Sequence, residues 1–405
     1  MLIFIRFTSI SMTDLKRNKN ITSFTNHNKL SLIKVGKDYF DILEQLIDNA
    51  KQVIHLQTYI FDYDETGQQV ANALIRAAAR KVNVYVVLDG YASQNLPKKV
   101  IEEFEGNNIH FCWFSPLLQS RYFYFGRRLH HKVLVVDGNN ALVAGINISN
   151  RYNDIEGHEA WLDWAIWSQG EVALQVSAVC KRIWDKGVLH KKDTPAIEPV
   201  MDARLPVDIC KARVRENDWV RRKNEISANY ISMLRNAKHQ VIIMSSYFLP
   251  GRKIRKSIDD AVKRGVKIIV ITSGQTDVPV AKYAEKHIYS WLLKRNIELF
   301  EYRSNVLHGK ISVSDSSIVT IGSYNLNNIS AYASIELNIE VQNQTFAIEV
   351  ENTLMKIVDK SCDRITSDSL SKSHNLFSKA WYWLCYHAIR LIVYLFTFYF
   401  KHHKE

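Results

Sequence analysis

Two copies of a short motif combine residue types that suit phosphate chemistry. Both copies read His-x-Lys-x4-Asp, namely His130, Lys132 and Asp137 in the first and His308, Lys310 and Asp315 in the second. A neutral imidazole can attack phosphorus, and an ammonium can bind the oxygens whose negative charge grows in the transition state. One copy alone would usually be a solvated strand end. Two copies at one spacing predict an active site for transfer at a phosphate ester.

Each motif opens an apolar run that we expect to be a strand. Alternate side chains of a strand share a face, so the histidine and the lysine project together into one cleft. A matching tail follows each motif, with Gly145 and Asn147 in the first copy and Gly322 and Asn325 in the second. Small residues let the backbone approach a bound phosphate, and an asparagine amide adds hydrogen-bond donors without charge.

The motifs lie at equivalent places in an internal repeat. Residues 50–61 are echoed by residues 237–248, each a helix end that runs into a buried strand, and residues 78–87 are echoed by residues 262–271. Helices that alternate with strands indicate mostly parallel sheets covered on both faces. The sequence therefore predicts an α/β fold of two homologous α/β/α domains, mixed β-sheets flanked by helices, with the active site at their pseudo-twofold interface.

Composition places the boundaries of these domains. Pro195, Pro199 and Pro206 fall in a polar stretch between the repeats, as in a linker. The first eleven residues are apolar but too short for a signal peptide, which indicates a frayed leader or a true start at Met12. We expect a flexible leader over 1–30, a first domain over 31–190, a linker over 191–215, a second domain over 216–370 and a separate C-terminal segment over 371–405.

The net charge indicates the kind of molecule that the protein binds, and the cysteine content indicates which structural sites it lacks. The 405 residues include 53 Lys+Arg against 41 Asp+Glu, so the net charge of +12 favours a polyanion, either nucleic acid or anionic lipid. Hydrophobic residues make up 47% of the chain, which excludes a largely disordered protein. The 5 cysteines are scattered without a C-x-x-C pair, which argues against a disulfide framework or a zinc site.

The doubled motif with its tails resembles the phospholipase D superfamily, whose pattern is a repeated H-x-K-x4-D-x6-G-[SG]-x-N. The second copy fits every fixed position, and the first departs only at Ala144. In that family one histidine attacks phosphorus to give a phosphohistidine while the other protonates the leaving oxygen. The resemblance thus implies His130 and His308 as the catalytic pair, with His130 the preferred nucleophile. It also implies phosphate binding without a metal or other cofactor by Lys132, Lys310, Asn147 and Asn325.

A nucleophilic imidazole needs an acceptor at its far nitrogen. Glu340 ends a Leu337–Glu340 stretch that resembles the family's L-N-x-E, and Asp163 precedes the corresponding strand of the first half. We expect these two carboxylates to orient the histidines. Asp137 and Asp315 belong to the catalytic motif, and we expect them to tie the loop after each motif strand through salt bridges.

The C-terminal segment suits a lipid surface. Residues 380–400 are long enough to span about 30 Å of hydrocarbon. Arg390 in the middle would cost about 2.5–3.5 kcal/mol at a bilayer centre. Lys379, Arg390 and Lys401 share one face of a helix, which favours a membrane-associating helix in the headgroup region. A true span and a soluble packing helix are the alternatives.

Several stretches, among them residues 57–61 and 246–251, resemble the bacterial cardiolipin synthases. This resemblance implies a peripheral enzyme of the cytoplasmic membrane that acts on anionic phospholipid and joins two phosphatidylglycerols into cardiolipin, with no stable nucleic-acid partner. The alternatives are another transphosphatidylation or phospholipid hydrolysis and, from other classes, a nucleic-acid phosphodiesterase or a non-catalytic membrane scaffold.

Overall fold

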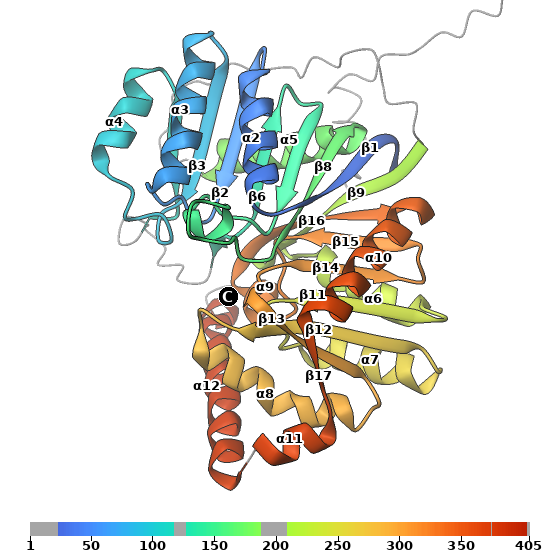
Figure 1. Cartoon of the computed structure of the whole chain (residues 1–405). Coiled ribbons are helices and arrows are strands. Elements are labelled where there is room, and N and C mark those ends of the chain that lie inside the picture. The colour runs from blue at the N-terminus through green and yellow to red at the C-terminus, as the bar shows by residue number, and fades with distance from the viewer. Residues whose placement is uncertain (1–22, 117–126, 188–208, 374, 403–405) are drawn as a thin grey trace, which may run out of the picture.

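The structure, a computed structural model, describes residues 23–116, 127–187, 209–373 and 375–402. In these ranges the chain forms two α/β halves, one stacked on the other, with a long C-terminal helix beside the second (Figure 1).

Each half is built on one mixed sheet. In the first, the order is β4 (His110–Phe114), β3 (Asn83–Asp89), β2 (Val53–Thr58), β6 (Lys132–Val136), β7 (Asn140–Ala144), β8 (Trp164–Gly170) and β1 (Thr25–Lys34). In the second, it is β17 (Cys362–Ile365), β13 (Glu298–Val306), β12 (Lys267–Gln275), β11 (Gln240–Ser245), β14 (Lys310–Ser314), β15 (Ile318–Gly322), β16 (Ser334–Gln342) and β9 (Ile209–Asp218).

The repeat predicted from the sequence is therefore present in the structure as the same order of strands in the two sheets. The expectation of mostly parallel strands was wrong. Among the described strands, β2–β3–β4, β11–β12–β13 and the short β5–β16 pair run parallel, whereas the motif strands begin antiparallel runs. Two short strands, β5 (Arg128–Leu129) and β10 (Lys223–Asn224), complete the pairing.

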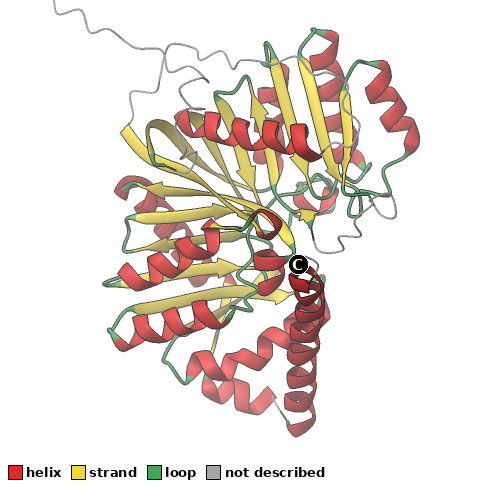
Figure 2. Ribbon diagram, turned by 180° about the vertical axis from the view of Figure 1, so that it is seen from behind, coloured by secondary structure: helices red, strands yellow, loops and turns green. Residues whose placement is uncertain are grey.

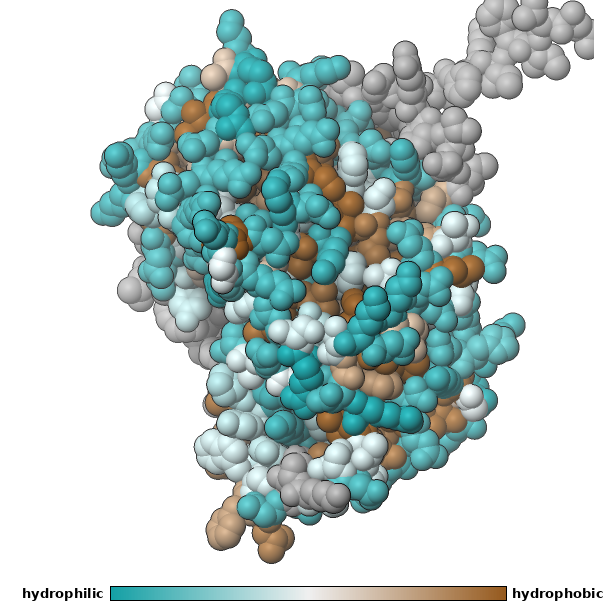
Figure 3. Space-filling view, viewed as in Figure 1, coloured by the Kyte–Doolittle hydropathy of each residue, from teal (hydrophilic) through white to brown (hydrophobic). Residues whose placement is uncertain are grey.

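Amphipathic helices cover the outer face of each sheet. These are α2 (Lys37–Asp48), α3 (Glu65–Ala79) and α4 (Lys98–Gly106) in the first half, and α6 (Glu225–Asn236), α7 (Arg252–Lys263) and α8 (Pro279–Leu293) in the second. In α7, Ile254, Ile258 and Ala261 fall one or two turns apart and are buried. The outward sides are mostly hydrophilic on the face that Figure 3 shows.

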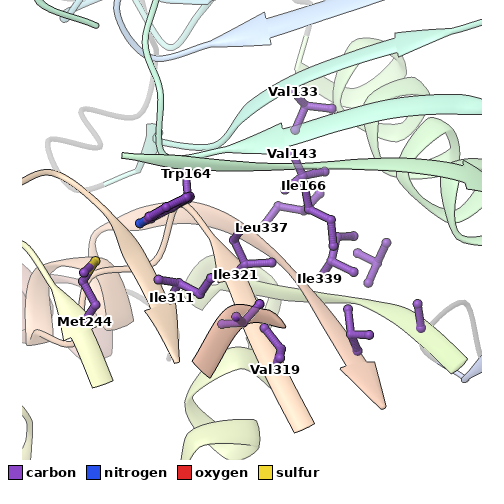
Figure 4. Packing of buried hydrophobic residues seen from close by; sticks show 14 of the residues in the cluster. Val133, Val143, Trp164, Ile166, Met244, Ile311, Val319, Ile321, Leu337 and Ile339 are labelled. Carbon is purple, nitrogen blue, oxygen red and sulfur yellow. The ribbon is translucent and has the colours of Figure 1, made fainter. Parts of the chain in front are cut away.

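The inner faces of the two sheets pack on each other. Val143 and Ile166 of the first half lie against Ile321, Leu337 and Ile339 of the second (Figure 4). Two further helices, α5 (Glu171–Gly187) and α10 (Gln344–Ser361), contribute to this core. Strand β1 pairs with both β8 and β9, so it hydrogen-bonds one sheet to the other. The halves are thus fixed relative to each other by a shared core.

Two of the predicted boundaries need correction. Residues 25–30, expected in a flexible leader, belong to β1, and residues 209–215, expected in the linker, belong to β9. Strand β9 pairs along β16 from Asp218 opposite Ile335 to Lys211 opposite Gln342, which explains why it is ordered. The rest of the leader and linker, 1–22 and 191–208, lies outside the described residues.

The remaining elements are short turns and helices within the halves, followed by two C-terminal helices. They are the 3-10 turns η1 (Asn150–Tyr152) and η2 (Trp219–Arg221) and the helices α9 (Asn328–Tyr332), α11 (Ser367–Ser373) and α12 (Leu376–His402). Helix α12 packs against α8 and α9 (Figure 2). Among the helices that the structure describes, none combines the length and the hydropathy needed to cross a bilayer.

Candidate active site

The two motif histidines lie where the halves meet. His130 stands between β5 and β6, and its N–H donates to the carbonyl of Ile335 in the second half at 3.0 Å. His308 immediately precedes Gly309 and β14, and its N–H donates to the carbonyl of Leu162 in the first half at 2.7 Å. Burial lowers the pKa of both imidazoles, and the charge of the lysine from the other motif, Lys310 for His130 and Lys132 for His308, lowers it further. The duplicated motifs therefore form one site.

Each imidazole is held by a carboxylate of the opposite half. Glu336, on β16, lies 2.9 Å from Nδ1 of His130, and Asp163, just before β8, lies 2.7 Å from Nδ1 of His308. Both carboxylates are fully buried. Because Nδ1 of each ring is engaged, Nε2 is the nitrogen available to a substrate. The structure thus brings Asp163 to a histidine, as predicted.

The expectation for Glu340 was wrong. Its carboxylate accepts hydrogen bonds from Arg213 at 2.7 Å and from Arg215 at 2.6 Å. Glu340 follows Glu336 by four residues on β16, which places it about 13 Å farther along the strand. An acid between apolar residues, as in Leu162-Asp163-Trp164, fits Ile335-Glu336-Leu337 and Ile339-Glu340-Val341 equally, so this sequence pattern does not single out Glu336.

The two lysines are buried next to the histidines. Nζ of Lys132 donates to the carbonyl of His130 at 2.5 Å, and Nζ of Lys310 donates to the carbonyl of His308. Nζ of Lys310 also lies 3.9 Å from Asp163. Burial lowers the pKa of Lys132 to about 7 and that of Lys310 to about 8. Partly desolvated ammonium groups of this kind gain most when an anion such as a phosphodiester enters.

These lysines predict an alkaline limit to activity. We expect kcat/KM to fall as the pH rises through about 7 to 8, because a neutral amine no longer attracts the phosphate. A pH profile of the wild type beside Lys132→Arg checks this, since a guanidinium stays protonated and only the limb from Lys310 should remain. Activity that stays constant to pH 10 in the wild type would contradict it.

The asparagines stand on loops beside the histidines. Oδ1 of Asn147 accepts from the N–H of Ile60 at 3.2 Å, and its amide donates to the hydroxyl of Tyr152 at 2.9 Å. Oδ1 of Asn325 accepts from Ser246 at 2.6 Å. In both residues a protein donor occupies the oxygen, so the NH2 group is the end suited to a phosphate oxygen.

Two tyrosines that the sequence analysis did not identify flank the imidazoles. The ring of Tyr59 lies 4.8 Å from that of His130, and the ring of Tyr152 lies 5.2 Å from that of His308. Both contacts are edge-on, and they restrict the rotation of the imidazoles about their side-chain bonds. Tyr59 was visible in the repeat, where it corresponds to Tyr247, but its place beside a histidine depends on the loop after β2.

The motif aspartates lie at the other end of the motif strands. Asp137 accepts from the backbone N–H groups of residues 51–53 at 2.8–3.0 Å, and Asp315 from those of residues 238–240 at 2.8–2.9 Å. The expected tie is thus present, but its partners are backbone N–H groups and not cations. Neither carboxylate contacts His130 or His308 in these hydrogen bonds, which gives both aspartates a structural role.

This role predicts a loss of stability without a comparable loss of rate. Asp315→Ala should lower the free energy of unfolding by about 1–3 kcal/mol, because three backbone N–H groups, two exposed and one half-buried, lose a charged acceptor. These bonds lower the pKa of Asp315, so its contribution is present at neutral pH and is lost as the pH falls through that lowered value. Denaturant titrations at pH 7 and pH 3 measure both effects. A kcat reduced a hundredfold at full folding would refute the structural role.

Comparisons with known proteins identify the family of the chain. Residues 43–184 and 230–358 match the family described as cardiolipin synthase, PLD-like domain. The chain belongs to the cardiolipin synthase branch of the phospholipase D superfamily. It is a phosphatidyltransferase enzyme of that superfamily, with the predicted mixed α/β fold.

Individual relatives of this branch cover most of the chain. Cardiolipin synthase B of Salmonella typhimurium is 30% identical over 359 residues, covering 85% of this chain and 84% of its own, and that of Escherichia coli is 29% identical over 364 residues, covering 86% and 85%. Cardiolipin synthase 1 of Staphylococcus aureus is 27% identical, covering 78% and 64%. The crystal structure of phosphatidylserine synthase from Haemophilus influenzae shares the fold with a TM-score of 0.70 at 14% identity, covering 95% and 99%.

Proposed function

We propose that this cardiolipin synthase homologue joins two phosphatidylglycerols into cardiolipin and releases glycerol. The observation that carries the proposal is the pair of histidines, each bonded to a carboxylate of the other half and next to a buried lysine. Relatives named cardiolipin synthase support the choice of lipid over nucleic acid.

The reaction proceeds in two displacements. Nε2 of His130 attacks the phosphorus of one phosphatidylglycerol, and the bond from phosphorus to the glycerol headgroup oxygen breaks as His308 donates a proton to that oxygen. Glycerol leaves and a phosphatidyl group stays on His130. A hydroxyl of a second phosphatidylglycerol then gives its proton to His308 and attacks phosphorus, which releases His130 and forms cardiolipin.

Accessibility supports His130 as the nucleophile. Its side chain is 17% exposed against 8% for His308. Burial lowers the pKa of both imidazoles, so the free enzyme offers a neutral ring for attack. The bound phosphate brings negative charge that favours the protonated form of the other ring, which is the form required of a general acid.

The remaining site residues serve the phosphate. Lys132 and Lys310 neutralise its non-bridging oxygens, and the NH2 groups of Asn147 and Asn325 donate to them. Asp163 and Glu336 hold the histidines in the reactive tautomer. We assign the enzyme to the cytoplasmic face of a bacterial inner membrane as a peripheral protein, supported by the net charge of +12 and the aromatic C-terminal segment.

Mass spectrometry of lipids tests this proposal. Purified protein is incubated with phosphatidylglycerol vesicles beside the His130→Ala and His308→Ala variants. Cardiolipin and glycerol formed by the wild type alone are the expected products. Phosphatidic acid without cardiolipin would make the enzyme a phospholipid hydrolase. If no lipid changes, the lipid assignment fails, and single-stranded DNA becomes the substrate to test.

A further inference from the structure

Exposed large apolar side chains are unevenly distributed over the part of the chain that the structure describes. One group lies on α12 and comprises Leu376, Phe377, Trp381, Trp383, Leu384, Leu391 and Ile392. A second group lies on loops and helix ends near the catalytic histidines and comprises Tyr63, Tyr91, Val278, Val280, Ile329 and Tyr332. The remaining one, Ile348 on α10, stands apart from both groups. Clusters of exposed apolar side chains of this kind are typical of surfaces that bind a membrane or another molecule.

One side of α12 is bound to the catalytic domain. Tyr382 stacks on Tyr283 of α8 at 5.7 Å, and the hydroxyl of Tyr386 accepts from Arg255 of α7 at 3.0 Å. Cys385, between these tyrosines, is buried. The helix is therefore part of the second half over this stretch, and its orientation relative to the active site is fixed.

The exposed part of α12 carries apolar and basic side chains. Phe377, Trp381, Leu384 and Leu391 recur at spacings of four, three and seven residues, which places them on one stripe of the helix. Trp381, at the edge of the stripe, also contacts Tyr283 edge-on at 6.3 Å. Lys379 and Arg390 are exposed roughly 140° around the helix axis from the stripe, and residues 376–402 contain no aspartate or glutamate. A helix with exposed apolar and basic side chains and no acidic one is complementary to an anionic lipid surface.

The helix that carries this stripe runs toward the junction of the two halves. The C-terminal end of α12 lies at the level where the two halves meet in both views (Figures 1 and 2). There it contacts α9, on which Ile329 and Tyr332 are 46% and 40% exposed. Val278 and Val280 stand at the start of α8, after β12, on the sheet edge where β14 follows His308. At its other end the stripe forms the apolar tip at the bottom of Figure 3, where α12 begins.

We propose that these residues form one docking surface for an anionic phospholipid bilayer, made of the outward stripe of α12 (Phe377, Trp381, Leu384 and Leu391) together with Val280 and Ile329. The surface lies in the headgroup region and faces the opening of the catalytic site to the bilayer. The inference rests on the proposed function for the source of the substrate, but binding to vesicles requires no turnover. It differs from a tail anchor, because α12 stays attached to α8.

Vesicle sedimentation with matched variants tests the docking surface. The variants are Leu384→Ser with Leu391→Ser on α12, Val280→Ser with Ile329→Ser near the site, and Ile348→Ser as an equally apolar control elsewhere. Each is mixed with vesicles of phosphatidylglycerol and phosphatidylcholine. Turnover is measured in parallel on dihexanoyl phosphatidylglycerol below its critical micelle concentration, where no bilayer is present.

We expect both paired variants to lose vesicle affinity by about tenfold or more, because each removes two side chains from the lipid contact. Turnover of the monomeric substrate should stay within about twofold, and Ile348→Ser should behave as the wild type in both assays. Wild-type binding by the α12 pair, or an equal loss in Ile348→Ser, would overturn the proposal. Absent turnover together with the expected binding pattern would refute the proposed function and leave the docking surface intact.

Thermal unfolding midpoints show whether the paired serine variants fold. If they do not, a further single variant, Arg390→Gln, tests the proposal. Arg390→Gln removes an exposed cation that lies 5.5 Å from the ring of Tyr386. It should weaken binding to the anionic vesicles at low salt and leave binding to pure phosphatidylcholine unchanged. Unchanged affinity for anionic vesicles in this variant would overturn the assignment of the surface to anionic lipid.

Discussion

His130→Ala and His308→Ala each lower kcat for cardiolipin formation by about three to four orders of magnitude, as expected for the loss of a nucleophile or a general acid. The two imidazoles form one site from two halves, so one histidine cannot replace the other. Steady-state kinetics on phosphatidylglycerol measure the loss. Both variants should keep the wild-type unfolding midpoint within a few degrees, because neither side chain fills the hydrophobic core.

A substrate with an activated leaving group separates the roles of the two histidines. When the headgroup is replaced by p-nitrophenol, the leaving oxygen needs no proton, so the variant without the general acid should still release nitrophenolate in a burst. The variant without the nucleophile should not. We expect the burst in His308→Ala and a phosphatidyl group on His130 after quenching in alkaline denaturant, because the P–N bond of a phosphohistidine is labile in acid. A burst in His130→Ala with none in His308→Ala would reverse the assignment.

The repeat made much of the fold predictable. Corresponding positions have corresponding conformations, as in the left-handed backbone of Asn108 and Asn296, which lie between a helix and the strand after it, β4 in the first half and β13 in the second. The same repeat identified both motif strands. The spacing of residues within one repeat is sufficient to predict these elements, because each half forms the same β-α-β order from contacts between residues close in the sequence.

The pairing across the halves could not be predicted in this way. His130 meets Glu336 because β5 pairs with β16, and His308 meets Asp163 because its backbone is bonded to Leu162. Both are contacts between residues more than a hundred positions apart, and they depend on how the sheets pack. Glu336 and Glu340 lie on the same strand, so sequence alone could not tell which one the register places at the histidine.

The error at β9 had a different cause. Cys210, Ala212 and Val214 are buried and alternate with basic residues, which is a strand pattern of period two. The prolines just upstream led the prediction to extend the linker over it. Two of the basic residues that alternate with the buried ones, Arg213 and Arg215, donate hydrogen bonds to the carboxylate of Glu340.

The pair Glu336 and Glu340 therefore gives a sharp test of the site. We expect Glu336→Gln to lower kcat by about three orders of magnitude, because an amide no longer fixes the tautomer of His130 or stabilises its cation. Glu340→Gln, on the same strand and equally isosteric, should lower stability through its arginine pairs and leave kcat within about threefold. Asp163→Asn should resemble Glu336→Gln, since Asp163 holds His308.

A pH profile distinguishes positioning by Glu336 from general damage. The charge of Glu336 and its hydrogen bond raise the pKa of His130 against the opposing effect of burial. Without that charge the imidazole loses its proton at lower pH, so the acidic limb of kcat/KM should move to lower pH in Glu336→Gln. Glu340→Gln should keep the wild-type limb. An acidic limb that moves equally in both variants, or in neither, would show that Glu336 does not act through His130, and the crossed carboxylate arrangement would then be a feature of the fold alone.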